Sequence, residues 1–112
     1  MGRLDGDLAL LSELTEVYRE DYPLQLQLAR QALSIGDEEG LKRAAHSLKG
    51  SLGNLAANNA CGMAASLEEL ARRNELKFAG AKLDQLEPEL NHVYESLAAL
   101  YQKQAAIPAA RT

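Results

Sequence analysis

The sequence contains little of several residue types on which common protein functions depend. Cys61 is the only cysteine among 112 residues, which excludes an internal disulfide framework and a multi-cysteine metal site. The two histidines, His46 and His92, show no metal-binding spacing such as HExxH. We therefore expect that this chain binds no metal ion.

Long apolar runs and a strong positive charge are also missing. No apolar run approaches the roughly 18–20 residues that a transmembrane helix requires, and no signal-peptide pattern opens the sequence. The formal net charge is −4, whereas a general nucleic-acid binder depends on a broad basic surface. We expect a cytoplasmic protein without membrane contact and without a nucleic-acid partner.

The residues that are present are typical of a small helical domain. Apolar residues make up 46% of the chain and aromatic residues only 4%, and the dominant leucine and alanine favour helices over strands. A length of 112 residues suits a single domain. We predict an all-α fold, an antiparallel four-helix bundle with an additional short N-terminal helix. Its core should span about residues 4–104, and residues 105–112 should form a frayed tail or linker.

Caps and helix breakers divide the chain. Pro23 should restart it after a first helix, Gly36 should end the second helix, and Asp37 should cap the third. Pro88 should kink or break the last helix. The five expected helices cover about residues 4–20, 23–35, 38–57, 60–73 and 78–104.

The third expected helix keeps its apolar residues apart from a histidine. Spacings of four and three residues place five of them on one stripe: Leu41, Ala45, Leu48, Leu52 and Leu55. His46 lies roughly 140° from the centre of that stripe. Four residues surround it on the same outward side: Lys42, Lys49, Gly50 and Gly53. The helix should therefore present an imidazole on a basic, solvent-facing surface.

The two glycines of this surface need a physical reason. Each costs about 0.5–1 kcal/mol relative to alanine inside a helix. Gly50 and Gly53 do not end the helix, since the apolar stripe continues to Leu55. They face outward with His46, so packing inside the domain does not explain them. We infer that they leave space for a partner that approaches the imidazole.

These residues resemble a known family signature. The run His46-Ser47-Leu48-Lys49-Gly50, followed by Gly53 and Leu55, is similar to the motif of histidine-containing phosphotransfer (HPt) domains. HPt domains are helical bundles that carry a phosphoryl group on histidine in two-component phosphorelays. The resemblance extends from about Leu8 to about Leu100. The sequence departs from the family at Ala56, where a glycine is usual.

The resemblance implies a role for each residue of the motif. His46 would be the phosphoacceptor, and Lys49 would neutralise the phosphoryl oxygens. Gly50 and Gly53 would admit the loops of a response-regulator receiver domain. That receiver would supply the aspartate and Mg²⁺, so the chain would need no cofactor of its own.

The residues themselves point to a nucleophile without a complete active site. A neutral imidazole nitrogen can attack phosphorus without a dedicated base. The sequence offers neither a carboxylate cluster for Mg²⁺ nor a glycine-rich loop for a nucleotide. Lys42 and Arg43 lie outside the motif, and we assign them to electrostatic steering toward an acidic receiver pocket.

Two classes of function are compatible with the sequence. The first is a phosphorelay intermediate that exchanges phosphoryl groups with receiver domains. It could be free-standing, belong to a hybrid sensor histidine kinase, or be the phosphoacceptor domain of a chemotaxis kinase. The second is a non-catalytic helical-bundle adaptor, which would have no physical reason to keep His46, Lys49 and Gly50 together.

Overall fold

The computed structural model describes the backbone of residues 2–55 and 57–111 and the side chains of residues 9–55 and 57–102. Ala56, where the sequence departs from the HPt pattern, lies outside the described residues. The described backbone forms four α-helices and no strand: α1 (Gly2–Ile35), α2 (Glu38–Asn54), α3 (Asn58–Arg72) and α4 (Leu76–Arg111). The expected all-helical fold is confirmed.

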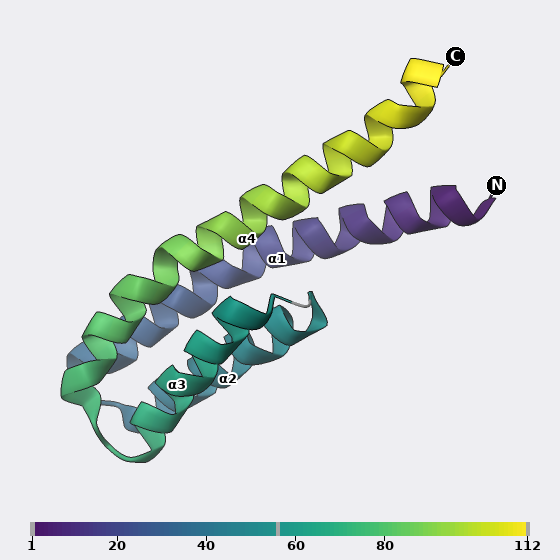
Figure 1. The fold of residues 1–112 in the computed structure, drawn as a ribbon. Helices are drawn as coiled ribbons and strands as arrows, with labels where there is room; N and C mark the ends of the chain where they lie inside the picture. The colour runs from purple at the N-terminus through teal and green to yellow at the C-terminus, as the bar shows by residue number, and fades with distance from the viewer. Residues whose placement is uncertain (1, 56, 112) are drawn as a thin grey trace.

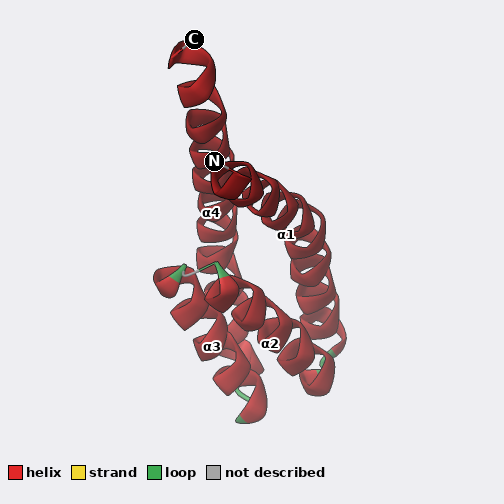
Figure 2. Cartoon of the chain, turned by 90° about the vertical axis from the view of Figure 1, so that its right-hand side faces the viewer, coloured by secondary structure: helices red, strands yellow, loops and turns green. Residues whose placement is uncertain are grey.

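The helices run up and down in chain order. The long helices α1 and α4 form one pair, and the shorter α2 and α3 pack beside one end of it (Figure 1). Figure 2 shows how α1 and α4 project beyond the shorter pair. Each helix contacts the next one along the chain, and α1 also contacts α4. The molecule is therefore elongated, with principal extents of 57 × 20 × 20 Å.

Leucine and alanine side chains fill the core. The largest fully buried side chains are all leucines: Leu41, Leu48, Leu52, Leu67, Leu83, Leu86 and Leu90. Every helix also contributes a fully buried alanine: Ala29, Ala45, Ala64 and Ala79. These small side chains let neighbouring backbones approach closely, while the leucines fill the remaining space. Three of the leucines belong to α2, so packing fixes the rotation of that helix about its axis.

The expected separate N-terminal helix is not confirmed, because α1 continues through Pro23. A proline inside a helix costs about 3 kcal/mol, since it lacks an N–H and its ring crowds the preceding turn. Contacts with α4 on both sides of Pro23 offset this cost. The Tyr18 hydroxyl donates to the Leu90 carbonyl at 2.8 Å, and Arg30 pairs with Glu87 at 2.8 Å. Tertiary packing therefore overrides the local helix breaker.

The last helix also continues through its proline. Pro88 lies inside α4 on an exposed position, whereas Leu86 and Leu90 beside it are fully buried. Burial of these neighbours holds both halves of the helix against the core, so the expected break does not occur. The backbone of α4 is helical up to Arg111, whereas the helix was expected to end near residue 104.

The start of α2 follows the sequence closely. Gly36 ends α1 with a positive φ of 73°, a conformation that glycine adopts without steric cost. Asp37 then caps α2, and its side chain accepts a hydrogen bond from the Gly40 backbone N–H at 3.0 Å. The helix ends at Asn54, three residues before the expected end at 57. The turn at Gly36, the cap at Asp37 and the buried leucines together determine which residues of α2 face solvent.

Candidate functional site

His46 lies on the solvent-facing side of α2. Its side chain is 67% exposed, whereas Ala45 and Leu48 on the opposite side of the helix are fully buried. The apolar stripe of α2 packs into the bundle and leaves the imidazole accessible. A large reactant such as another protein domain can therefore reach the ring.

Glu68 of α3, which sequence reasoning did not identify, joins two residues of the expected site. One carboxylate oxygen lies 3.0 Å from His46 Nδ1, and the other lies 2.8 Å from Lys49 Nζ. The Glu68 side chain is only 11% exposed. His46, Lys49 and Glu68 thus form one connected polar cluster across the α2–α3 interface.

The sequence did carry a signal for Glu68. The buried positions of α3 share one stripe: Ala60, Ala64, Leu67, Glu68 and Ala71. Glu68 is the only acidic residue on that stripe, four residues after Ala64. A carboxylate on a buried face needs a partner, because burying an unpaired charge is costly. The identity of the partners depends on how α2 and α3 align, which the periodicity of one helix does not reveal.

The cluster determines the charge and hydrogen bonding at the imidazole. The hydrogen bond from Lys49, followed by that from His46, holds the pKa of Glu68 below its usual value despite the opposing effect of burial. Glu68 is therefore ionised at neutral pH and can only accept hydrogen bonds. Nδ1 of His46 must then carry the hydrogen that it shares with Glu68. In the neutral ring this leaves the lone pair on Nε2, the nitrogen that does not contact Glu68.

The basic surface around His46 is smaller than the sequence suggested. Lys49 is engaged by Glu68, and Lys42 pairs with Glu39 at 3.4 Å. Arg43 is exposed, and it lines a groove between α1 and α2 on the side away from Glu68. The three cations therefore have different surroundings, although Lys42 and Arg43 were expected to act together in electrostatic steering.

The two glycines leave open surface beside His46. A Cβ atom added at Gly50 would meet no described atom within 4 Å. One added at Gly53 would lie 3.9 Å from Cys61 Sγ, an ordinary contact distance. Neither glycine is required by packing within the described chain. This observation supports the inference that their role concerns a partner.

Alanine at Gly50 or Gly53 should stabilise the domain and slow the phosphoryl transfer that the resemblance implies. Gly50→Ala should raise the free energy of unfolding by about 0.5–1 kcal/mol, because alanine favours the helix interior and meets no obstacle. Gly53→Ala should raise it less, because Gly53 is the penultimate residue of α2. Denaturant unfolding and transfer kinetics check the two effects. Gly80→Ala on α4 is the matched control, because a Cβ there would also make an ordinary contact, at 3.6 Å from Leu33. Wild-type transfer rates in both α2 variants would refute the clearance role.

Other chemical sites are not evident in the described part of the chain. No group of three or more histidine, cysteine, aspartate or glutamate side chains there could hold a metal ion. None of the described helices combines the length and the apolar character that crossing a membrane requires. His92 is exposed on α4 and lines a different groove, beside the α2–α3 connection. The polar cluster on α2 and α3 is thus the candidate site.

Comparison with known proteins agrees with this site. The family model described as Hpt domain matches residues 13–100, a range that includes the whole cluster. The crystal structure of histidine-containing phosphotransfer protein B from Pseudomonas aeruginosa PAO1 is similar, with a TM-score of 0.77 and 32% sequence identity. The similarity covers 92% of this chain and 94% of that one. No curated protein sequence matches the chain. The chain therefore belongs to the Hpt domain family and is a histidine phosphorelay intermediate.

Proposed function

We propose that His46 is the phosphoacceptor of this domain and that Nε2 is the attacking nitrogen. The observation that carries the proposal is the Glu68 carboxylate at 3.0 Å from Nδ1 of a histidine whose side chain is 67% exposed. Glu68 holds the ring in one orientation and selects the tautomer with a free Nε2 lone pair. The nucleophile is thus oriented from inside the bundle and open to solvent on its reactive side.

The transfer step balances without an added base. The Nε2 lone pair attacks the phosphorus of an aspartyl phosphate on a receiver domain, so a P–N bond forms. The P–O bond to the aspartate breaks, and the aspartate leaves as a carboxylate. Nδ1 keeps its hydrogen, so the phosphorylated ring carries a positive charge. The ionised Glu68 next to Nδ1 stabilises that charge. Donation to a second receiver is the reverse reaction.

Lys49 supplies positive charge to the phosphoryl group in this proposal. In the unphosphorylated chain its ammonium pairs with Glu68, one helical turn from His46. A flexible side chain can turn from one anion to another, and a point charge suffices to neutralise phosphoryl oxygens. We propose that Mg²⁺ and the acidic pocket come from the receiver, with Lys42 and Arg43 contributing to electrostatic encounter.

Lys49→Ala should reduce transfer on the order of ten-fold even at saturating receiver, because it removes a charge from the reacting group. The phosphohistidine lifetime should also shorten. Rapid-quench kinetics at several receiver concentrations separate this effect from a binding defect. Lys42→Ala serves as the control, because Lys42 pairs with exposed Glu39 and not with the cluster. An unchanged rate at saturating receiver would exclude Lys49 from the chemistry.

The experiment that tests the function is incubation of the chain with a panel of receiver domains carrying labelled aspartyl phosphate. Label should move to this chain and be acid-labile and alkali-stable, as expected of phosphohistidine. A non-catalytic adaptor would bind a receiver without acquiring label.

The same panel identifies the partner receiver. Assays with sensor kinases test whether a kinase also exchanges phosphoryl groups with this domain. Fractionation of cells would test the proposed cytoplasmic location.

A further inference from the structure

The two long helices extend well beyond the two short ones. At 1.5 Å per residue, the 34 residues of α1 and the 36 residues of α4 extend about 51 and 54 Å. The 17 residues of α2 and the 15 residues of α3 extend only about 25 and 22 Å. Beyond the α2–α3 pair, the described backbone consists of α1 and α4 alone (Figures 1 and 2). We call this stretch, about residues 2–14 and 97–111, the two-helix part.

Leucines line the inner side of the two-helix part. We call five of them the leucine face: Leu10, Leu11, Leu14, Leu97 and Leu100. Leu10 is 55% exposed and Leu100 is 45% exposed, whereas the other three are half-buried. Exposed glutamates such as Glu16 and Glu95 lie on the opposite sides of the two helices. The two-helix part is therefore amphipathic, with an apolar side that remains open.

Two grooves connect the leucine face with the end of the α2–α3 pair. Leu14 lines a groove of about 60 Å³ together with Leu55, which follows α2. Leu97 and Leu100 line another groove, of about 310 Å³, which also reaches Leu55. Because Leu55 borders both grooves, the leucine face begins directly where α2 and α3 end. It points toward the space that two further helices of a bundle would occupy.

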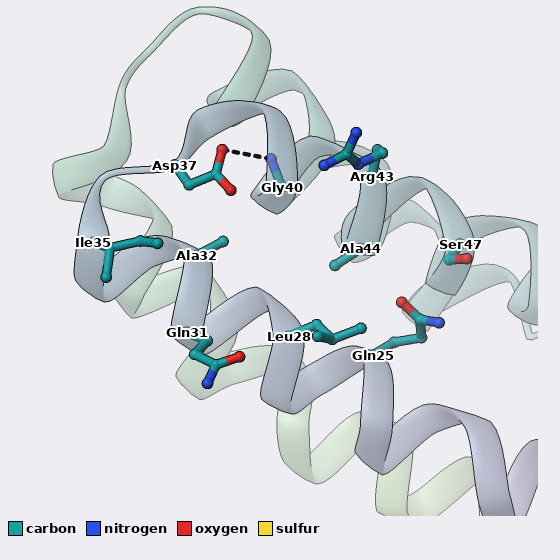
Figure 3. A pocket seen from close by; sticks show the side chains of 10 residues that line it. All are labelled: Gln25, Leu28, Gln31, Ala32, Ile35, Asp37, Gly40, Arg43, Ala44 and Ser47. Carbon is teal, nitrogen blue, oxygen red and sulfur yellow. Dashed lines mark hydrogen bonds between the residues drawn. The ribbon is translucent and has the colours of Figure 1, made fainter.

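The other end of α1 shows what normally covers this side of the helix. Figure 3 shows Leu28 and Ala32 of α1 across a groove from Ala44 of α2. Ala32 and Ala44 are buried there. Leu28 lies about four helical turns after Leu14, so the two leucines fall on nearly the same side of α1. The two parts of the molecule thus differ in the helices available for cover, and not in the apolar character of α1.

We propose that the leucine face binds the leucine face of a second copy of this chain, so that two α1–α4 pairs complete an antiparallel four-helix bundle. A second copy supplies two helices of the required length, with the same apolar side. A parallel dimer is excluded because both α2–α3 pairs lie on the leucine side and would collide. An antiparallel two-fold axis places them at opposite ends and makes the contact self-complementary.

The size of the leucine face predicts a weak dimer. The face is about 20 Å long and about 20 Å wide, so two copies would bury on the order of 1,000 Å² in total. Interfaces of this size are at the small end for specific complexes, and we expect a Kd on the order of 10–100 μM. His46 lies about 12 Å before the end of α2 and stays outside the contact. The inference therefore goes beyond phosphotransfer and does not depend on it.

Sedimentation equilibrium of the full chain over about 1–500 μM tests the dimer. Leu100→Ser should raise the dimer Kd about ten-fold or more, because the two-fold axis makes one substitution remove two buried contacts. Leu28→Ser is the matched control, since Leu28 is 43% exposed but lies beside α2. It should leave the Kd within about two-fold. A chain that is monomeric at every concentration, or equal effects of the two variants, would overturn the proposal.

A second pair of variants tests the contribution of α1. Leu10 is 55% exposed on the leucine face, and Leu24 is 50% exposed outside it. Leu10→Ser should weaken the dimer about ten-fold, and Leu24→Ser should not. Circular dichroism verifies that each variant stays helical. If Leu10→Ser dimerises like the wild type, α1 does not take part and the four-helix arrangement is wrong.

Distances between spin labels test the antiparallel arrangement. The label is placed at Asn59→Cys in a Cys61→Ser background, because Asn59 is exposed in the first turn of α3. The length of the two-helix part separates the ends of the two α2–α3 pairs in the proposed dimer. Pulsed electron paramagnetic resonance should therefore give a distance of about 20–35 Å between the two copies. A distance outside this range would overturn the proposed geometry.

Discussion

Replacing His46 with glutamine should abolish phosphoryl acceptance while leaving the fold intact. The variant lacks the ring nitrogen that forms the P–N bond in the proposed step. The side chain is 67% exposed, and in the variant Lys49 still pairs with Glu68. The loss of the imidazole should therefore change the free energy of unfolding by no more than about 1 kcal/mol. The amount of acid-labile label measures phosphoryl acceptance. Circular dichroism and thermal unfolding measure whether the fold is intact.

The exposed His92 provides a control for the same substitution. His92→Gln removes a histidine from the surface of α4 and should leave labelling at the wild-type level. If acid-labile, alkali-stable label persists on the His46 variant, the phosphoacceptor lies elsewhere. Loss of helicity in that variant would show that the imidazole supports the bundle, contrary to its exposed position.

Removing the carboxylate of Glu68 should reduce both transfer and stability. In Glu68→Ala neither Nδ1 of His46 nor the Lys49 ammonium keeps its partner on α3. A hydrogen bond to a charged group contributes about 1.5–3 kcal/mol, which corresponds to roughly ten- to a hundred-fold in rate if it acts in the transition state. Glu68→Gln should recover part of the activity, because its amide oxygen can still accept one hydrogen bond. Wild-type transfer in Glu68→Ala would show that orientation by Glu68 is dispensable.

The stabilising effect of Glu68 should depend on pH in a defined direction. Hydrogen bonds from Lys49 and His46 lower the pKa of Glu68 in the folded chain. A lowered folded-state pKa means that the stabilisation is fully present above the unfolded carboxyl pKa of about 4.3. It is lost as the pH falls through the lower folded-state value. Melting temperatures of wild type and Glu68→Ala should therefore differ by several degrees at neutral pH and converge on acidification.

A matched variant separates this local effect from general acid denaturation. Glu95 is an exposed glutamate of α4, and Glu95→Ala should track the wild-type melting temperature across the same pH range. If the difference between wild type and Glu68→Ala stays constant from neutral to acidic pH, the Glu68 charge does not stabilise the folded domain.

The position of His46 was predictable because it depends on one helix alone. The stripe of Leu41, Ala45, Leu48 and Leu52 obeys the helical period, and all four side chains are fully buried. A histidine that falls opposite such a stripe must face solvent once the helix packs. The same local logic located Gly36 as the end of α1 and Asp37 as the cap of α2.

Local rules were insufficient where packing between helices competes with them. Pro23 and Pro88 were expected to interrupt the chain, since a proline removes one backbone hydrogen bond. Both occupy exposed positions on long helices whose other faces are held by buried side chains and by contacts between α1 and α4. A local cost of a few kcal/mol is smaller than the packing that a broken helix would lose.

The sequence by itself determined the helical class, the exposure of His46 and the outward position of the two glycines, because each depends on the period of one helix. Only the tertiary structure decided that Glu68 joins His46 to Lys49, and that Arg43 faces α1 without a carboxylate partner in the described chain. Those pairings depend on the register and rotation of neighbouring helices. Many side chains of the whole bundle set that register together, so no single segment of the sequence encodes it.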